Sequence, residues 1–537
     1  MIRKTDGQQT FTEVEAWCAP LLDPNSFYAK MNRYGAIWFR DDDFAGMYRA
    51  GGRPSVPPSL LAMALMLQMY TDVSDRELVQ RLRFDLRFKY ALNVPIEYPG
   101  FDPSLLSHFR SRLLEHEKAA QAFQRTLEIA KSAGFVAAGD EQATDSAPIL
   151  GAAAVQDTWT LIRTGIEKLL RTLEPFESHG FVAPFPKEKY LLNPGKANID
   201  WNDHSQKSAY LAELVGDARS LLKVVEDPTE AEPGSAAQRI VAADSAVRHA
   251  RELLRRILAQ DVDDRPEGPR IRRGKNATKD RVISTNDPSM RHGHKTASHL
   301  FAGYKSAITV TLTTELVTAV DVIAANVHDS VPLPGQLKSL KISGIFPARI
   351  YADCAYGGAD IRVSVEAEGS EIVAKVPASF RTGKHFPKDR FKIEMQGRVA
   401  ERVSCPAGQS TTTFRQGKDD RGRQVQVARF GVEQCNGCEL HEQCTPLKKK
   451  GRELQLHHHE DVLQWARSKA TQPGFREDMK KRLVVERINS RLQDYGLKTG
   501  RYFGIQKTRL QAYFAAAVNN FWRVTTLLTS ATKAATT

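Results

Sequence analysis

The stretch Ala348–Gly358 reads ARIYADCAYGG and decides how the rest of the chain is interpreted. Its apolar first half, with Ile350 and Tyr351, favours a short strand over 350–353. The Tyr-Gly-Gly that follows predicts a turn. Asp353 therefore stands at the end of a strand, where a rigid element can hold a carboxylate at the edge of a cleft.

Strand patterns recur on both sides of this stretch. Ile308, Val310 and Leu312 alternate with threonines, which is the period of a half-buried strand. A helix-sized segment, 331–341, precedes the strand of Asp353. Further strands are expected at 136–150, which carries Asp145, at 316–325 and at 371–376. Strands joined through a crossover helix predict a mixed α/β sheet.

The chain before and after these strands is predicted to be largely helical. Ser59 opens an apolar run, Ser74 and Glu77 form a capping-box pair, and a third helix follows Pro103. Short helices with a cationic last member fit a helix-turn-helix DNA reader, and a plain helical bundle with a charged face is the alternative. The remaining expectations are helices over 152–260 and 476–530, and a loop over 265–295.

The charge of the chain favours a polyanionic partner. Its 537 residues hold 76 Lys and Arg against 63 Asp and Glu, a net charge of +13. Nine cations accompany three acids in 265–295, and ten accompany four in 476–509. Such clusters indicate DNA or RNA, with a merely basic protein as the alternative. At 41% hydrophobic residues, this length predicts two to four domains with sizeable cores.

Composition also predicts the compartment. The amino terminus has no apolar signal core, and no stretch approaches the ~20 apolar residues of a membrane span. Six cysteines in 537 residues do not make a secreted disulfide scaffold. We therefore expect a cytoplasmic protein without a membrane partner.

Three widely spaced acids, Asp145, Asp353 and Glu486, are the candidate chemical site. Glu486 lies on a predicted helix, on the polar face opposite an apolar stripe that includes Ile488. Three such carboxylates can hold two divalent ions about 3.5–4 Å apart around a phosphodiester. Hard oxygen ligands suit Mg²⁺ or Mn²⁺. For Glu486 the alternative is a solvated side chain paired with Arg482.

Four cysteines form a second candidate metal site. Cys435 and Cys438 have the Cys-x2-Cys spacing that lets two thiolates bind one ion, with Cys405 upstream and Cys444 downstream. Structural Zn²⁺ is the favoured ion. An iron–sulfur cluster, free thiols and cytosolic disulfides are the alternatives. The tract His457–His459 is expected to lie on the surface, because consecutive side chains diverge.

Several motifs together resemble those of bacterial insertion-sequence transposases of the DDE class, which carry a ribonuclease-H-like catalytic core. They cover most of the chain. The motifs are DPSLLSHFR at 102–110, TDS at 144–146, YADCAYG at 351–357, and VER at 485–487 followed by RYFG at 501–504. A cysteine insertion between the second acid and the Glu also occurs in one branch of these elements. Many relatives have Tyr and Lys where this chain has Met479 and Gln493, and Lys498, Arg501 or Lys507 are the candidate replacements.

The resemblance implies a fold class, which is α/β with a ribonuclease-H-like mixed-sheet core, a helical amino-terminal DNA-binding domain, a helical insertion and a four-cysteine zinc-binding insertion. The implied domains are 1–130 for DNA binding; 136–154, 296–378 and 471–530 for the catalytic core; 155–295 for the helical and basic insertion; and 379–470 for the four-cysteine insertion. Implied catalytic residues and Mg²⁺ or Mn²⁺ ligands are Asp145, Asp353 and Glu486. Implied Zn²⁺ ligands are Cys405, Cys435, Cys438 and Cys444.

The implied reaction is DNA transposition. The enzyme would bind terminal inverted repeats, cleave at the element ends and transfer the 3′-hydroxyls to target DNA. Its partners would be double-stranded DNA and further copies of the chain in a synaptic complex, in the bacterial cytoplasm or at the nucleoid. Candidate DNA contacts are Arg53, Arg81, Arg110, Arg112, Arg272, Arg273, Lys295, Lys305, Arg482, Arg501 and Lys507. A stand-alone Mg²⁺ nuclease and a non-catalytic, zinc-containing DNA-binding regulator remain as alternatives.

Overall fold

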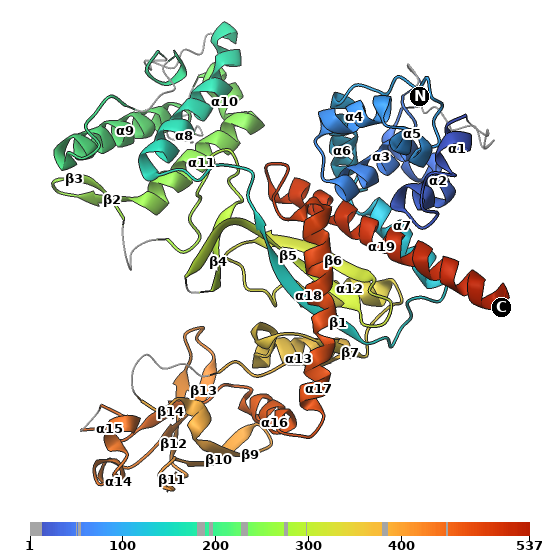
Figure 1. The fold of residues 1–537 in the computed structure, drawn as a ribbon. Helices are drawn as coiled ribbons and strands as arrows, with labels where there is room; N and C mark the ends of the chain where they lie inside the picture. Colours follow the sequence, from blue (N-terminus) through green and yellow to red (C-terminus); the bar gives the residue numbers. More distant parts are fainter. Residues whose placement is uncertain are drawn as a thin grey trace.

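A computed structural model places most of the chain (Figure 1). It describes residues 13–49, 51, 55–179, 188–192, 197–226, 235–272, 278–296, 298–378, 385–446 and 449–536. A central sheet carries helices on its faces, and three further parts surround it: the amino-terminal helices, a helical unit around α8–α11, and a small β-rich unit around β9–β14. No helix in the described part of the chain is long and apolar enough to cross a membrane.

The central sheet is mixed, which confirms the predicted α/β class. Its strands are β1 (Gln142–Leu150), β4 (Arg291–Thr296), β5 (His299–Thr311), β6 (Val317–Ala324), β7 (Arg349–Tyr351) and β8 (Glu371–Val373). They are ordered β4-β5-β1-β7-β8, and β6 also pairs with β5. Strand β5 is antiparallel to β1, β4 and β6, whereas β7 is parallel to β1 and β8. Crossover helices α12 (Leu333–Ile342) and α13 (Ala359–Glu368) join the parallel strands.

The amino-terminal helices share one hydrophobic core with this sheet. They are α1 (Glu13–Cys18), α2 (Phe27–Trp38), η1 (Asp41–Met47), α3 (Pro58–Thr71), α4 (Asp75–Phe84), α5 (Leu86–Ala91), α6 (Ser104–Glu115) and α7 (Gln121–Ser132). Ser74 caps α4 by accepting the Glu77 N–H, as the capping-box pattern predicts. Helix α3 is buried on all sides over 58–69, the property of a central helix rather than a surface one.

The carboxy-terminal helices close the sheet. They are α17 (Phe475–Lys481), α18 (Leu483–Leu492), the π-helical turn η7 (Gln493–Leu497) and α19 (Ile505–Thr536). Helix α18 lies across β1 and β5, and α19 runs back along α7 and α3 (Figure 1). Gly496, with φ 79°, makes the bend between them. Phe521 of α19 packs edge-on against Phe27 of α2, with ring centroids 5.5 Å apart, so the two ends of the chain form one packed body.

The helical unit has a core of its own, around Leu161, Leu214 and Leu254. Its elements are α8 (Thr158–Leu173), η2 (Glu174–His179), η3 (Glu188–Leu192), α9 (His204–Val224), α10 (Ala236–Ala243), α11 (Ser245–Asp261), β2 (Val262–Arg265) and β3 (Gly268–Ile271). The hairpin β2–β3 lies at the start of 265–295 and strand β4 at its end, and the described residues between them, 278–290, form turns and loop as expected. Antiparallel backbone pairing, such as that of Asp263 with Arg270, orders only the first residues of this basic segment.

The cysteine insertion also contains more regular structure than its sequence indicates. Its elements are η6 (Lys388–Arg390), β9 (Lys392–Gln396), β10 (Val399–Ser404), β11 (Ser410–Thr411), β12 (Phe414–Lys418), β13 (Gln424–Arg429), α14 (Val432–Asn436), α15 (His441–Cys444), β14 (Glu453–Gln455) and α16 (Glu460–Ala470). Two three-stranded sheets enclose a small core that includes Val403, Ala428 and Leu454. The strands are too short, and too often interrupted by turns, for hydrophobic periodicity in the sequence to predict this core.

Candidate active site and cysteine cavity

Asp145 and Asp353 lie on neighbouring parallel strands. The pairing of β1 with β7 matches Ala143 with Tyr351, and each acid follows two residues later. Paired strands are about 4.8 Å apart, so the register brings the two acids side by side. Asp353 follows the end of β7 and accepts the Ala355 N–H at 2.9 Å, which holds its carboxylate at the turn. Asp353 thereby caps the short 3-10 turn η5 (Cys354–Tyr356), which precedes the two glycines.

Glu486 faces these two acids from α18. The helix is fixed by Val485, Ile488 and Leu492, which are fully or almost fully buried. Glu486 lies on the other face, with its side chain 45% exposed, and pairs with Arg482 at 2.7 Å. The ion pair with Arg482, which was the alternative interpretation of Glu486, is therefore present. Glu486 nevertheless lies near enough to Asp145 for its charge to affect the pKa of Asp145.

Electrostatics show that the three acids influence one another. Burial, together with the nearby charges of Asp353 and Glu486, raises the pKa of Asp145 to about 6, although a backbone hydrogen bond from Ser146 and the charge of Arg482 oppose the shift. Asn489, one turn beyond Glu486, donates to Asp145 Oδ2 at 3.3 Å. A carboxylate that is buried beside two others is stabilised in its charged form by a cation.

The donor set therefore fits divalent cations. Three carboxylates on rigid elements supply the oxygen ligands that Mg²⁺ and Mn²⁺ prefer. Their oxygen atoms do not all lie within 4.8 Å of one another, so they are farther apart than in a closed metal site. Among the described residues, the group that meets this distance is Asp360, His457 and His458. The acids are close enough to interact electrostatically.

The Asp360 group joins α13 to the cysteine insertion. His457 and His458 both reach Asp360, at 3.8 and 3.3 Å, so the expectation that these histidines diverge is wrong. Arg423 donates to both oxygens of Asp360, at 3.0 and 2.9 Å. The His459 N–H donates to His457 Nδ1 at 3.0 Å. Since a guanidinium already neutralises the carboxylate, we interpret the group as a polar junction rather than a metal site.

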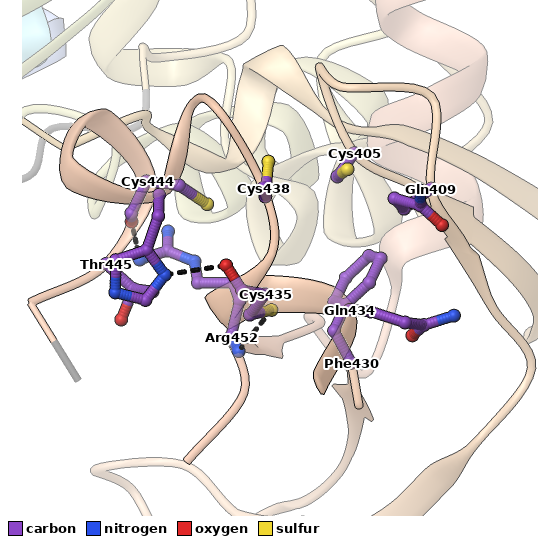
Figure 2. Close-up of a pocket in the computed structure, with 10 residues that line it drawn as sticks. Cys405, Gln409, Phe430, Gln434, Cys435, Cys438, Cys444, Thr445 and Arg452 are labelled. Atoms are coloured by element: carbon purple, nitrogen blue, oxygen red, sulfur yellow. Dashed lines mark hydrogen bonds between the residues drawn. The ribbon is translucent and has the colours of Figure 1, made fainter. Parts of the chain in front are cut away.

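The four predicted cysteine ligands line one cavity, shown in Figure 2, which has room for about one water-sized occupant at ≈ 20 Å³. Burial and the neighbouring thiols Cys405 and Cys438 raise the pKa of Cys435. The backbone N–H of Arg452 donates to Cys435 Sγ at 3.3 Å, as a stabiliser of a thiolate would. The sulfurs are set wider than a closed tetrahedral site, and binding an ion would draw them together.

Two predicted DNA contacts are engaged inside the protein. Arg110 is almost buried, donates to both carboxylate oxygens of Asp75 at 3.0 and 2.5 Å, and lies over the Tyr502 ring at 4.6 Å. Arg501 donates to the carbonyl of Val73 at 2.6 Å and pairs with Asp72. Both arginines are held by partners within the protein, and their contact with DNA stays a prediction.

Other predicted contacts are more accessible. Lys295, on β4, Lys507, at the start of α19, and Arg272, after β3, are exposed. Arg482 pairs with Glu486, and Lys305 of β5 pairs with Asp329. Partial exposure is retained by Arg81, which bonds Glu77 at 2.6 Å, and by Arg112, which lies over the Tyr48 ring at 4.8 Å. Arg53 and Arg273 fall outside the described residues.

Sequence reasoning assigned no role to three residues that the structure places beside the candidate sites. Asn489 contacts Asp145, and its position three residues after Glu486 on the same polar face was the available signal. Asp329, the partner of Lys305, acts with Asp145 and Asp353 to raise the pKa of the buried Tyr356, after burial itself. His441 lines the cysteine cavity and bonds the Cys435 carbonyl through Nδ1 at 2.7 Å.

Comparison with known families gives two matches. A family described as Transposase DDE domain matches residues 404–525, a segment that contains the four cysteines and Glu486. A family described as Transposase domain (DUF772) matches residues 18–112. Neither the curated proteins nor the solved structures gave a match to the chain. Both matches are to transposase domains, which is consistent with the predicted resemblance to insertion-sequence transposases of the DDE class.

Proposed function

We propose that the protein is a DNA transposase whose catalytic carboxylates are Asp145, Asp353 and Glu486. The observation that carries the proposal is the meeting of these acids from three distant segments of a chain with transposase domains at both ends. The enzyme would bind the terminal inverted repeats of its own element, cleave at their ends and transfer the 3′-hydroxyls to target DNA.

The topology of the central sheet supports a ribonuclease-H-like core. Strands β6, β5 and β1 are consecutive antiparallel neighbours, and β7 and β8 follow on the other side of β1 in parallel. Asp145 lies on the central strand, Asp353 follows its parallel neighbour, and Glu486 comes from a helix across the sheet. The three acids thus meet where strand ends and a helix face converge, the usual place for a site in an open α/β sheet.

The residues of the site would divide the chemistry as follows. Asp145, Asp353 and Glu486 would hold the divalent ions, and Asn489 orients Asp145 through its amide. Two bound Mg²⁺ or Mn²⁺ ions supply charge stabilisation to the attacking and leaving oxygens of a phosphodiester. Arg482, one turn before Glu486, can bind a phosphate oxygen next to the cut, since its guanidinium is already held at the site.

Other parts of the chain would handle the DNA. Arg81 and Arg112 are the remaining described candidates for reading the inverted repeat, and Arg272, Lys295 and Lys507 for binding phosphate. Zn²⁺ held by the four cysteines would stabilise the insertion. We further propose that the enzyme acts in the cytoplasm, as a homo-oligomer when two element ends are paired.

A strand-joining assay tests the proposal. Purified protein with Mg²⁺ or Mn²⁺ and duplexes that end in the element's own terminal repeats should cleave at the element end and join the 3′-hydroxyl to a plasmid. Scrambled ends are the matched control. Cleavage of both duplexes without joining would instead indicate a stand-alone nuclease, and specific binding without cleavage would indicate a DNA-binding regulator.

A further inference from the structure

Glu141, Tyr351 and Lys481 form a closed triangle of hydrogen bonds. The ammonium of Lys481 donates to Glu141 Oε2 at 3.1 Å and to the Tyr351 hydroxyl at 3.0 Å. The Tyr351 hydroxyl in turn donates to Glu141 Oε1 at 2.8 Å. Lys481 also lies over the Tyr351 ring, with Nζ 5.0 Å from its centroid. We call this triangle the Lys481 clamp.

Each corner of the clamp belongs to a segment that carries one of the three acids. Glu141 precedes Asp145 by four residues, Tyr351 precedes Asp353 by two, and Lys481 precedes Glu486 by five. Short, regular backbone connects each corner to its acid: strand β1, the end of β7, and the first turn of α18. The clamp is therefore linked to all three acids, although its members come from distant parts of the sequence.

The clamp is more than a surface ion pair. The Tyr351 ring is fully buried, which fixes the hydroxyl that receives Lys481. Although burial opposes it, the hydrogen bonds from Tyr351 and Lys481 hold the pKa of Glu141 below its usual value. Further charges extend the set, because Lys481 pairs with Asp478 at 3.2 Å and Glu141 lies 3.6 Å from Arg349. Networks of this kind restrain geometry better than isolated pairs do.

Glu486 depends on such a restraint. Its ion pair with Arg482 lies within the same few residues of chain and does not fix the helix relative to the sheet. Val485 and Ile488 pack α18 onto the sheet. The polar contacts of Arg487 with Glu315 and of Asn489 with Asp145 lie farther along the helix than its start. Lys481 ends α17 immediately before α18 begins, so its two bonds fix that start against β1 and β7.

We propose that Lys481 is a positioning residue, which through Glu141 and Tyr351 sets the separation of Glu486 from Asp145 and Asp353. The proposal rests on the proposed function, because it treats these acids as the metal ligands. A displacement of about 1 Å at a reacting centre can lower a rate on the order of 100-fold. Mutation of a residue that orients a metal ligand typically lowers the metal affinity about 10- to 100-fold.

Lys481→Met tests the role, because it keeps the length of the side chain and removes its charge and donors. The matched control is Lys480→Met, whose exposed ammonium bonds Glu477 within α17. Mn²⁺ binding is titrated on the full chain without DNA, and the Mn²⁺ dependence of end cleavage is measured in parallel. We expect Lys481→Met to weaken Mn²⁺ binding at least about tenfold, Lys480→Met to match the wild type, and Lys481→Arg to recover most of the loss.

The two readouts separate the clamp from the proposed function. Wild-type protein that binds Mn²⁺ through Asp145 but does not cleave would end the transposase proposal and leave the clamp standing. Unchanged Mn²⁺ binding in folded Lys481→Met would overturn the clamp. If Lys481→Met fails to fold, the double variant Glu141→Leu/Tyr351→Phe removes both clamp acceptors of Lys481 and keeps the buried ring. Unchanged Mn²⁺ binding in that variant overturns the clamp equally.

Discussion

The three acids and the four cysteines are built in opposite ways. The acids come from segments more than 100 residues apart and are held by one six-stranded sheet and its helices. The cysteines fall within residues 405–444 and line a cavity at the edge of a small core. A change in the acid site must move a large packed body, whereas the cysteine cavity can rearrange by itself.

This difference teaches what each site requires from a metal ion. The sheet keeps Asp145 beside Asp353 without an ion, and the charge of Asp353 adds to the effect of burial in raising the pKa of Asp145. Cys435 and Cys444 lie on the short helices α14 and α15, Cys438 lies between these helices, and Cys405 directly follows β10. Ion binding and local ordering would therefore be a single equilibrium there. We therefore expect the acid site to be preorganised for catalysis and the cysteine cavity to be completed by its ion.

The largest effect is expected at the acids. Asp145→Asn, Asp353→Asn and Glu486→Gln should each lower metal-dependent cleavage of element ends by more than about 100-fold, because each removes a charged ligand and little volume. DNA binding measured without divalent ions should stay near the wild-type value. Wild-type cleavage by any one variant would exclude that residue, and Asp140 or Glu477 would then be tested as its replacement.

A second prediction concerns the cysteine cavity. Cys438→Ser should lower the Zn²⁺ content of the purified protein and make residues 400–450 sensitive to protease, since a tetrahedral site loses one of four thiolates. The central sheet should stay folded, as judged by slow hydrogen exchange in β1 and β5. Cys18→Ser is the matched control, because that thiol lies in the amino-terminal core. Wild-type protein that contains iron and an iron–sulfur absorption band would assign the cavity to a different ion.

The contrast between the two sites also explains how far the sequence could predict them. Strand β5 was predictable because Ile308, Val310 and Leu312, at its end, alternate with threonines. The turn after Tyr356 followed from two glycines. The pairing of β1 with β7 brings Asp145 close to Asp353. It depends on contacts between segments about 200 residues apart, which the local sequence pattern does not predict.

Charged residues were the least predictable. Arg110 has the sequence signature of a DNA-reading helix, but Asp75 and Tyr502 bury it, and neither partner is near it in sequence. His457 and His458 were expected to diverge, yet Asp360 from another part of the chain draws both together. A charged side chain can be solvated, bind DNA or pair with a residue that is distant in the sequence, and only the tertiary fold decides among these.

A third prediction uses pH to test how closely the acids meet. The pKa of Asp145 is raised to about 6, so the folded state binds an extra proton between about pH 4 and 6. Its contribution to stability is therefore present below about pH 4 and is lost as the pH rises through about 6. At pH 7.5 without metal, Asp145→Asn should stabilise β1 by at most about 3 kcal/mol, and at pH 4.5 the gain should shrink.

Hydrogen exchange at β1 and β5 amides measures this difference directly, with chelator present. Added Mn²⁺ should stabilise the wild-type strands at pH 7.5 and leave Asp145→Asn nearly unchanged, since ligand binding to the folded state adds stability. An equal pH dependence in wild type and variant would show that Asp145 titrates normally, and neither burial nor the neighbouring acids would then raise its pKa.

The smallest expected effect is on the salt dependence of DNA binding, which tests which of the two sites contacts DNA. If phosphate reaches the acids, Arg482→Gln should flatten the plot of log affinity against log salt by about 0.9, the release of one counterion. Arg402→Gln changes an exposed arginine of β10, beside the cysteine cavity, and should leave the slope as it is. Measurements in chelator keep metal binding out of the comparison.

Because Arg482 also pairs with Glu486, the variant Glu486→Gln serves as control: it frees the guanidinium and should steepen the slope or leave it unchanged. A flatter slope for Arg402→Gln alone would place the DNA on the cysteine insertion and leave the acids without their substrate.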